Sequence, residues 1–218
     1  YQLAPQKEAR ESPVWREDMP YLAWLYAWYR SLLPMVVDER ALLFSALAPL
    51  AKVDARVALF ALPQLSLAAL TGSRAEDARR ALAAEFVAVL KSCEESGSDI
   101  ATMAAEAVFH IWDGLLRWVE RLRRGEDAHA TARTHSIATT AANVGAHRAR
   151  ATSDLLGDVP NLLLAKASLR CGSPARALMY AELHVRRVIG TNNPSSQRGG
   201  MNTHVRHEER DIALLARV

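Results

Sequence analysis

The chain has 218 residues, of which 50% are hydrophobic and 6% aromatic, and its formal net charge at pH 7 is +3. Ala and Leu dominate, whereas β-branched residues and Gly are sparse, a composition typical of stacked helices. Arg residues are interspersed with Glu and Asp, so charge does not support direct binding of nucleic acid. No run of about 18 apolar residues lacks charge and proline, which argues against a membrane-spanning segment.

The two cysteines, Cys93 and Cys171, lie far apart and lack metal-ligand spacing, so we expect two reduced thiols. Few cysteines and no secretory signal favour a nuclear or cytosolic compartment. The chain begins at Tyr1 rather than Met and ends in a helix-like stretch, DIALLARV. We therefore expect it to be a piece of a longer polypeptide.

Residues 1–19 are polar and lack a periodic stripe, which predicts an irregular lead-in. A helix is expected over residues 20–33, where most of the aromatic side chains gather. Trp24 and Trp28 lie on one side of it and invite a ligand-pocket hypothesis, in which the chain is a small helical enzyme. Core packing between neighbouring helices is the favoured interpretation, because no nucleophile, base or metal set accompanies the aromatics.

The next two predicted helices cover residues 38–51, opened by Asp38, and residues 54–70, capped by Asp54. Pro49 should terminate or kink the first, and Pro63 should kink or split the second. The residues expected on the buried stripes of these two helices are Leu42, Leu43, Ala46, Leu47 and Leu50, then Val57, Ala58, Phe60 and Ala61.

Two longer helices are predicted over residues 74–92 and 99–123, the second capped by Asp99. On the first, Ala78, Leu82, Phe86 and Val89 should face the core. The stripe expected on the second helix runs through Ile100, Met103, Ala107, Phe109, His110, Ile111, Leu115, Trp118 and Leu122.

Apolar periodicity fades over residues 125–153, which predicts an exposed linker. Residues 154–189 then form an αα-hairpin with a tight turn at Gly172, and Asp158 and Ser173 are expected as helix caps. The stripes that should pair in this hairpin are Leu163, Leu164, Ala167 and Cys171 on one helix, and Ala177, Leu178, Ala181 and Val185 on the other.

Residues 190–218 are expected to form a flexible loop followed by a divergent tail. The helical segments come in pairs joined by short turns, with no strict repeated motif. The predicted fold is therefore all-α, a solenoid of antiparallel helix pairs related to HEAT repeats, with residues 20–124 as its main HEAT-like part.

Candidate catalytic groupings are absent from the sequence. It has no glycine-rich phosphate loop and no kinase signature. Three linker histidines (His129, His135 and His147) lack a fourth metal ligand, and a tail pair (His204 and His207, with Glu208 beside it) falls in the segment expected to be flexible. We therefore assign no catalytic, cofactor-binding or metal-binding residue.

Two further charged groupings have structural explanations. Four arginines gather at the expected end of the helix over residues 99–123, where a solvated terminus that suits the helix dipole is favoured over a phosphate site; they are Arg117, Arg121, Arg123 and Arg124. Asp113 and His110, three residues apart, are expected to form a surface hydrogen-bonding pair.

Three ordered stretches carry a resemblance to a known family. Residues 55–70 (ARVALFALPQLSLAAL) resemble an apolar, proline-containing helix of ATR-type checkpoint kinases, members of the phosphatidylinositol 3-kinase-related kinase family. Residues 76–92 and 101–122 resemble its next helix pair, through the AVFHIWDGLLRW pattern. Residues 156–187, with VPNLLLAKASLRCGSPARALMYAE, resemble the opening of the FAT domain of these kinases.

The resemblance implies that the chain holds the end of a HEAT solenoid and the first FAT hairpin, a non-catalytic scaffold for a kinase active in the DNA damage and replication-stress checkpoint. It further implies a nuclear location and protein partners: the rest of the kinase, its partner subunit, and a second copy. ATP and a divalent metal would belong to the kinase domain, and this chain would need no cofactor. The alternative is a stand-alone helical-repeat interaction module, and whether the chain belongs to an enzyme stays open at this point.

Overall fold

The computed structural model describes residues 13–131 and 149–191, and within these ranges it contains helices and no strand. The all-α prediction is confirmed. A short helix at residues 149–158 precedes the final pair. The other helices are α1 (Tyr21–Leu32), the 3₁₀ helix η1 (Leu33–Met35), α2 (Arg40–Val53), α3 (Ala55–Leu70), α4 (Ala75–Ser96), α5 (Asp99–Thr131), α7 (Asn161–Arg170) and α8 (Pro174–Thr191).

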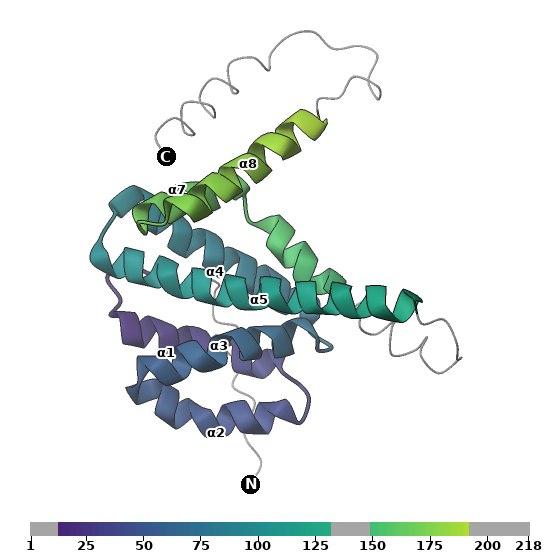
Figure 1. The fold of residues 1–218 in the computed structure, drawn as a ribbon. Helices are drawn as coiled ribbons and strands as arrows, with labels where there is room; N and C mark the ends of the chain where they lie inside the picture. The colour runs from purple at the N-terminus through teal and green to yellow at the C-terminus, as the bar shows by residue number, and fades with distance from the viewer. Residues whose placement is uncertain (1–12, 132–148, 192–218) are drawn as a thin grey trace.

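The helices are stacked in layers (Figure 1). α2 lies at one end and contacts α1 and α3, which contact each other. The α4–α5 pair forms the middle layer, with α5 against α3 and α4 against α7. The α7–α8 hairpin lies at the other end. Each layer buries a face that it could not bury alone, which is the property that defines a solenoid.

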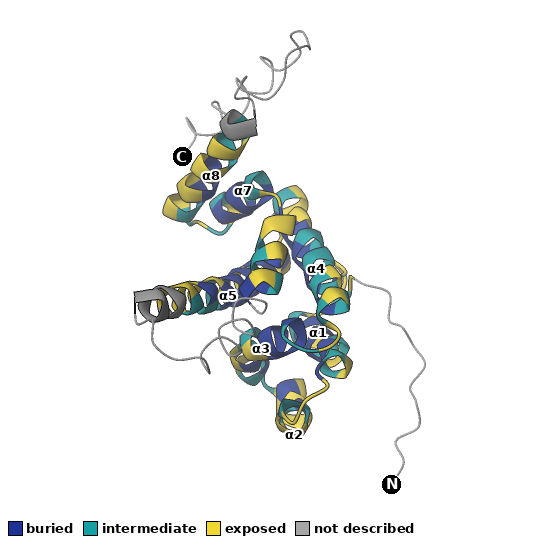
Figure 2. Cartoon of the chain, turned by 90° about the vertical axis from the view of Figure 1, so that its right-hand side faces the viewer, coloured by how far each residue is buried: buried dark blue, intermediate teal, exposed yellow. Residues whose placement is uncertain are grey.

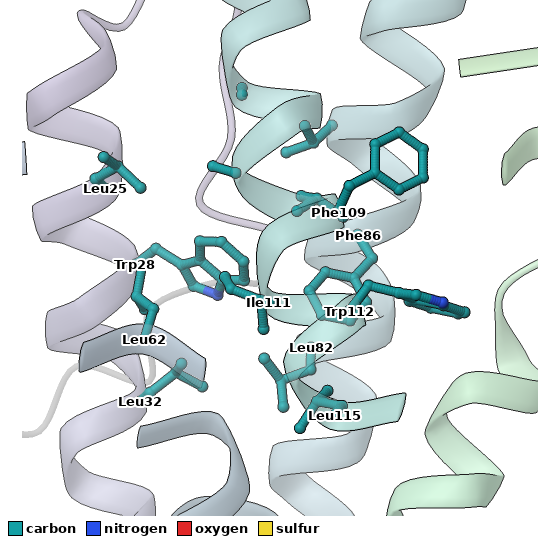
Figure 3. Close-up of a cluster of buried hydrophobic side chains, with 14 of the residues drawn as sticks. Leu25, Trp28, Leu32, Leu62, Leu82, Phe86, Phe109, Ile111, Trp112 and Leu115 are labelled. Atoms are coloured by element: carbon teal, nitrogen blue, oxygen red, sulfur yellow. The ribbon is translucent and has the colours of Figure 1, made fainter. Parts of the chain in front are cut away.

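Aromatic rings run in an unbroken series of contacts through the layers. The series begins in the segment before α1, crosses α1, α4 and α5, and ends on α8. Ring centroids are between 5.1 and 6.5 Å apart, and most pairs meet edge to face, the arrangement that aromatic quadrupoles favour. The rings in order are Trp15, Trp24, Trp28, Phe86, Trp112 and Tyr180, and Figure 3 shows three of them among the core side chains.

The stripe predicted for α4 is confirmed, because Ala78, Leu82, Phe86 and Val89 are all fully buried. Trp24 and Trp28 are also buried, with exposed fractions of 0% and 1%. They pack in the core, as favoured from the sequence, and do not form an accessible stacking platform.

The tight turn of the α7–α8 hairpin is confirmed in detail. Gly172 has a φ of +65°, a left-handed conformation that favours glycine. The Ser173 N–H donates to the Ser168 carbonyl at 2.9 Å and the Gly172 N–H donates to the Leu169 carbonyl at 3.0 Å. These two bonds form a Schellman motif, which ends α7, and Pro174 then begins α8 as predicted.

Two predicted helix caps are wrong and one is confirmed. The Asp54 carboxylate accepts from the Arg56 N–H at 2.9 Å, as expected. Asp99 is the first residue of α5, and the Ser98 hydroxyl before it accepts from the Ala101 N–H instead. Asp158 ends the preceding helix, and α7 starts after Pro160 without a side-chain cap.

The stripe predicted for α2 faces solvent. Leu42, Leu43 and Leu50 have exposed fractions of 78%, 60% and 54%, while the buried residues are Phe44, Ala48 and Ala51. Small side chains on the inner face let α2 approach its neighbours closely. This close packing decides which face of α2 is buried, against the expectation from the apolar periodicity. Similar errors affect Phe60, Ile100, Met103 and Leu178, which are also exposed.

Neither proline ends a helix. α2 continues through Pro49 to Val53, and α3 continues through Pro63 to Leu70. Pro63 lies against α5, where a Cβ added to Gly114 would be 3.1 Å from the Pro63 Cβ. Packing against Gly114 therefore supports the α3 backbone at the point where one helical hydrogen bond is missing.

The expected linker is partly helical. α5 extends to Thr131 and residues 149–158 are helical, so only residues 132–148 of the predicted 125–153 segment lie outside the described residues. The predicted lead-in over 1–19 is irregular where it is described, from residue 13 onward, but it packs into the core through Trp15. α8 reaches Thr191, and residues 192–218 are outside the description.

Candidate protein-interaction site

An exposed apolar face runs along the outside of α2. On a helix of 3.6 residues per turn, Leu42, Leu43, Leu50 and Val53 lie on one side, opposite the buried Phe44 and Ala51. We call these four residues the α2 face. Their exposed fractions range from 54% to 78%. Figure 2 shows this helix at the edge of the stack, with exposed surface directed away from the other helices.

The inner side of α2 is held in place by polar contacts. The Tyr29 hydroxyl of α1 donates to the Phe44 carbonyl at 2.6 Å, and burial raises the pKa of Tyr29 to about 12. At the start of α2, the Arg40 guanidinium pairs with Asp38 and donates to the Thr71 hydroxyl. Both contacts lie in the N-terminal half of α2 and hold that part of the helix in place, which lowers the ordering cost of association there.

The hairpin at the other end of the stack is joined to the α4–α5 layer by charged contacts. Arg176 donates to the Asp113 carboxylate at 2.8 Å and lies over the Phe109 ring, 4.7 Å from its centroid. Lys166 pairs with Glu94 at 2.5 Å. These contacts join α8 to α5 and α7 to α4.

A buried carboxylate anchors the segment before α1. Glu85 is 1% exposed and accepts from the Trp24 indole N–H at 2.7 Å and the Val14 N–H at 2.6 Å. Burial raises the pKa of Glu85, and hydrogen bonds from Trp24, Val14 and Trp15 oppose the rise. Because each of these donors belongs to the segment or to α1, Glu85 serves as a structural anchor.

The charged groupings weighed from the sequence are not brought together as a site. Arg117, Arg121 and Arg124 are exposed, and they lie within α5 rather than at its end, because the helix continues to Thr131. The expected dipole compensation is therefore wrong. Asp113 accepts from Arg176 of α8, and the predicted His110–Asp113 surface pair stays a prediction.

The side chains of the histidines considered as metal ligands lie outside the part of the chain that the structure describes. The side chain of His129 and the residues His135, His147, His204, His207 and Glu208 are outside the described part of the chain. Among the residues that the structure does describe, no group of three or more His, Cys, Asp or Glu side chains is placed to hold a metal ion. In the same part of the chain, every helix is too short or too polar to cross a membrane.

Sequence reasoning missed Glu85 and Arg176. Glu85 follows two alanines and precedes Phe86 in α4, so its place beside a buried stripe was a signal that this carboxylate would face inward. Arg176 offered no comparable signal, since its partners Asp113 and Phe109 lie on a helix more than 60 residues away.

Comparison with known proteins gives the family. The model of the M-HEAT region of the serine/threonine-protein kinase ATR matches residues 8–205. This range includes the α7–α8 hairpin that the resemblance assigned to the FAT domain, so that finer assignment stays a prediction.

Individual relatives agree with this match. The chain is 30% identical over 208 residues to the serine/threonine-protein kinase ATR of Oryza sativa subsp. indica, with 86% of this chain aligned. It is 28% identical over 225 residues to the protein of the same description in Arabidopsis thaliana, with 93% aligned. The chain spans about 8% of the length of each relative. No solved structure matches it. The chain belongs to the family of the M-HEAT region of the serine/threonine-protein kinase ATR.

Proposed function

We propose that this chain is a non-catalytic scaffold segment of an ATR-like Ser/Thr protein kinase that acts in the DNA damage and replication-stress checkpoint in the nucleus. The match of the M-HEAT model to residues 8–205 supports the parent kinase. The stacked helices with an exposed apolar face support the scaffold role. In this proposal ATP and a divalent metal bind elsewhere in the parent polypeptide.

The occupant that we propose for the α2 face is a neighbouring helical layer of the same polypeptide. α2 is the outer helix of the stack, and the chain spans only about 8% of its relatives, so most of such a polypeptide is available to cover it. Burying four aliphatic side chains would contribute roughly 1.5–3 kcal/mol for each one that becomes fully covered. The α7–α8 hairpin would face the other neighbouring region, where the FAT domain is expected.

The test is a charged double variant, Leu42→Glu with Leu50→Glu, introduced into the intact parent kinase. Both side chains are exposed, so stability of the 218-residue chain should change by less than about 1 kcal/mol. Kinase activity and co-purification of the partner subunit should fall at least tenfold, about 1.4 kcal/mol.

A matched control places the same charges on α5, as Met103→Glu with Leu116→Glu, whose side chains are 47% and 38% exposed. The control should keep activity near that of the unaltered kinase. Full activity and normal co-purification of the α2 variant would contradict the proposed docking. Concentration-dependent dimerisation of the 218-residue chain, abolished by the α2 variant, would instead assign this face to a second copy.

A further inference from the structure

A row of arginines follows the solvent side of α5 in its C-terminal half. Arg117, Arg121 and Arg124 are spaced by four and three residues, so they lie on one face of the helix on successive turns. All three are exposed, and we call them the arginine row. The helix dipole does not explain it, because the dipole acts within the last turn and α5 continues to Thr131.

Within the described residues, two of these three guanidinium groups have no acidic partner. No carboxylate in that part of the chain pairs with Arg117 or Arg121. The Arg121 Nε donates to the Arg117 carbonyl at 3.3 Å, which leaves its Nη groups for other acceptors. Arg124 pairs with Glu120 at 3.1 Å, but the two side chains are 76% and 53% exposed, so this pair is readily exchanged.

Arginines on α4 are arranged differently. Arg79 pairs with Glu76 at 2.8 Å and Arg80 with Asp77 at 2.9 Å, both within the helix. On α5, Arg117 and Arg121 instead place like charges four residues apart, a spacing that destabilises a helix. A negatively charged partner outside the described chain would remove this repulsion.

We propose that the arginine row binds an acidic helix of a separate protein, one that carries carboxylates on successive turns. This inference does not depend on the proposed function.

The shape of the row favours a linear acidic ligand. It is a linear array on a single helix, and Arg117 and Arg124 are about 10 Å apart along the axis, so one small anion could not contact all three side chains. A helix with glutamates spaced by four and three residues repeats the same spacing. Each guanidinium could then bind one carboxylate through two parallel hydrogen bonds.

Neighbouring carboxylates disfavour a nucleic acid as the ligand. Glu120 lies beside the row and is exposed. Glu106 is also exposed, and it lies on the same face of α5 three turns before Arg117. A continuous phosphate backbone running along α5 would meet both of these like charges, whereas a short acidic helix can cover the row alone.

The position of α5 indicates a separate chain as the source of the ligand. Neighbouring repeats of a solenoid contact each other through the ends of the stack, which here are α2 and the α7–α8 hairpin. α5 lies at the side of the middle layer, as Figure 2 shows, and its outward face carries the row. The next layers along the same polypeptide would therefore leave this face open.

The main experiment measures fluorescence anisotropy of a fluorescein-labelled, alanine-based peptide with glutamates spaced by four and three residues, titrated with the 218-residue chain. The glutamate peptide should bind, and its glutamine counterpart should bind at least tenfold more weakly. Raising the ionic strength from about 0.05 M to about 0.3 M should weaken binding of the glutamate peptide at least fivefold, because salt screens exposed charges.

A charge-swap variant tests the assigned residues. Arg117→Glu with Arg121→Glu should weaken binding of the glutamate peptide at least tenfold, and should bind a lysine counterpart of that peptide instead. The matched control is Arg30→Glu with Arg187→Glu, which changes the net charge equally at two exposed positions on other helices. The control should keep the affinity of the unaltered chain within about threefold.

The source of the ligand is tested in the parent kinase purified alone. Phenylglyoxal should modify Arg117 and Arg121 there as fast as in the 218-residue chain, as read from peptide masses. Protection of both arginines would overturn the inference, because the row would then be covered by its own polypeptide.

Two binding results would also overturn it. One is equal weakening in the charge-swap variant and in the control, since affinity would then follow net charge alone. The other is a single-stranded oligonucleotide that binds through the row more tightly than the glutamate peptide does.

Discussion

Replacing Glu85 by alanine should destabilise the chain more than any other substitution of a charged residue in the described helices. The carboxylate is 1% exposed and accepts from Trp24 at 2.7 Å and from Val14 at 2.6 Å. The alanine variant leaves both N–H donors buried without a partner, and each orphaned donor costs about 1–3 kcal/mol. The expected loss in the free energy of unfolding is about 2–4 kcal/mol. This figure allows for the fact that the variant no longer buries a carboxyl group.

Urea denaturation followed by tryptophan fluorescence measures this loss, because Trp15 and Trp24 are beside the substituted side chain. The control is Glu95→Ala, on the same helix but exposed, which should change the free energy of unfolding by less than about 0.5 kcal/mol. A loss below about 1 kcal/mol for Glu85→Ala would refute the anchoring role.

The pH dependence provides a second check on Glu85. Its pKa is raised in the folded chain, so the folded state binds the proton more tightly than the unfolded state. The contribution of this group is therefore fully present below the ordinary glutamate pKa and is lost as the pH rises through the folded pKa. Relative to Glu85→Gln, the unaltered chain should lose stability over that window. A difference that stays constant with pH, or changes in the opposite direction, would contradict the burial of a titrating carboxyl.

Two other substitutions test the contacts between layers. Arg176→Ala should cost about 1–2 kcal/mol in the same urea denaturation assay, because it removes both the Asp113 pair and the contact with the Phe109 ring. Arg186→Ala, in an exposed pair with Glu182, should cost less than about 0.5 kcal/mol. Equal losses would contradict the assigned role of Arg176. Gly114→Leu should destabilise by about 1–3 kcal/mol, because its side chain would meet Pro63, whereas Gly157→Ala, with open space around it in a helix, should stabilise by about 0.5–1 kcal/mol. A neutral Gly114→Leu would show that α3 and α5 are not in close contact there.

Local sequence patterns predicted the helices well, because most of these helices bury one face whose apolar residues recur with the period of an α-helix. α4 is the clearest example, with its four predicted core positions fully buried. The hairpin turn was also predictable. Glycine favours the left-handed conformation that ends a helix, as at Gly172, and proline favours the first position of a helix, as at Pro174.

The errors came from choices made by tertiary packing. α2 could bury either its leucines or its alanines, and periodicity alone favoured the leucines. From the sequence, Pro63 predicts a break in α3. Its packing against Gly114 of α5 is a tertiary contact that the local sequence does not indicate.

The exposed face that the sequence misassigned to the core is also the part of the chain that bears most directly on function. Hydroxyl-radical footprinting of the 218-residue chain and of the intact parent kinase compares the exposure of Leu42, Leu50 and Phe86 in the two contexts. The scaffold account predicts that oxidation of Leu42 and Leu50 falls at least fivefold in the intact kinase, while Phe86, already fully buried, stays protected in both. Equal oxidation of the two leucines in both samples would contradict the claim that this segment joins neighbouring parts of the kinase.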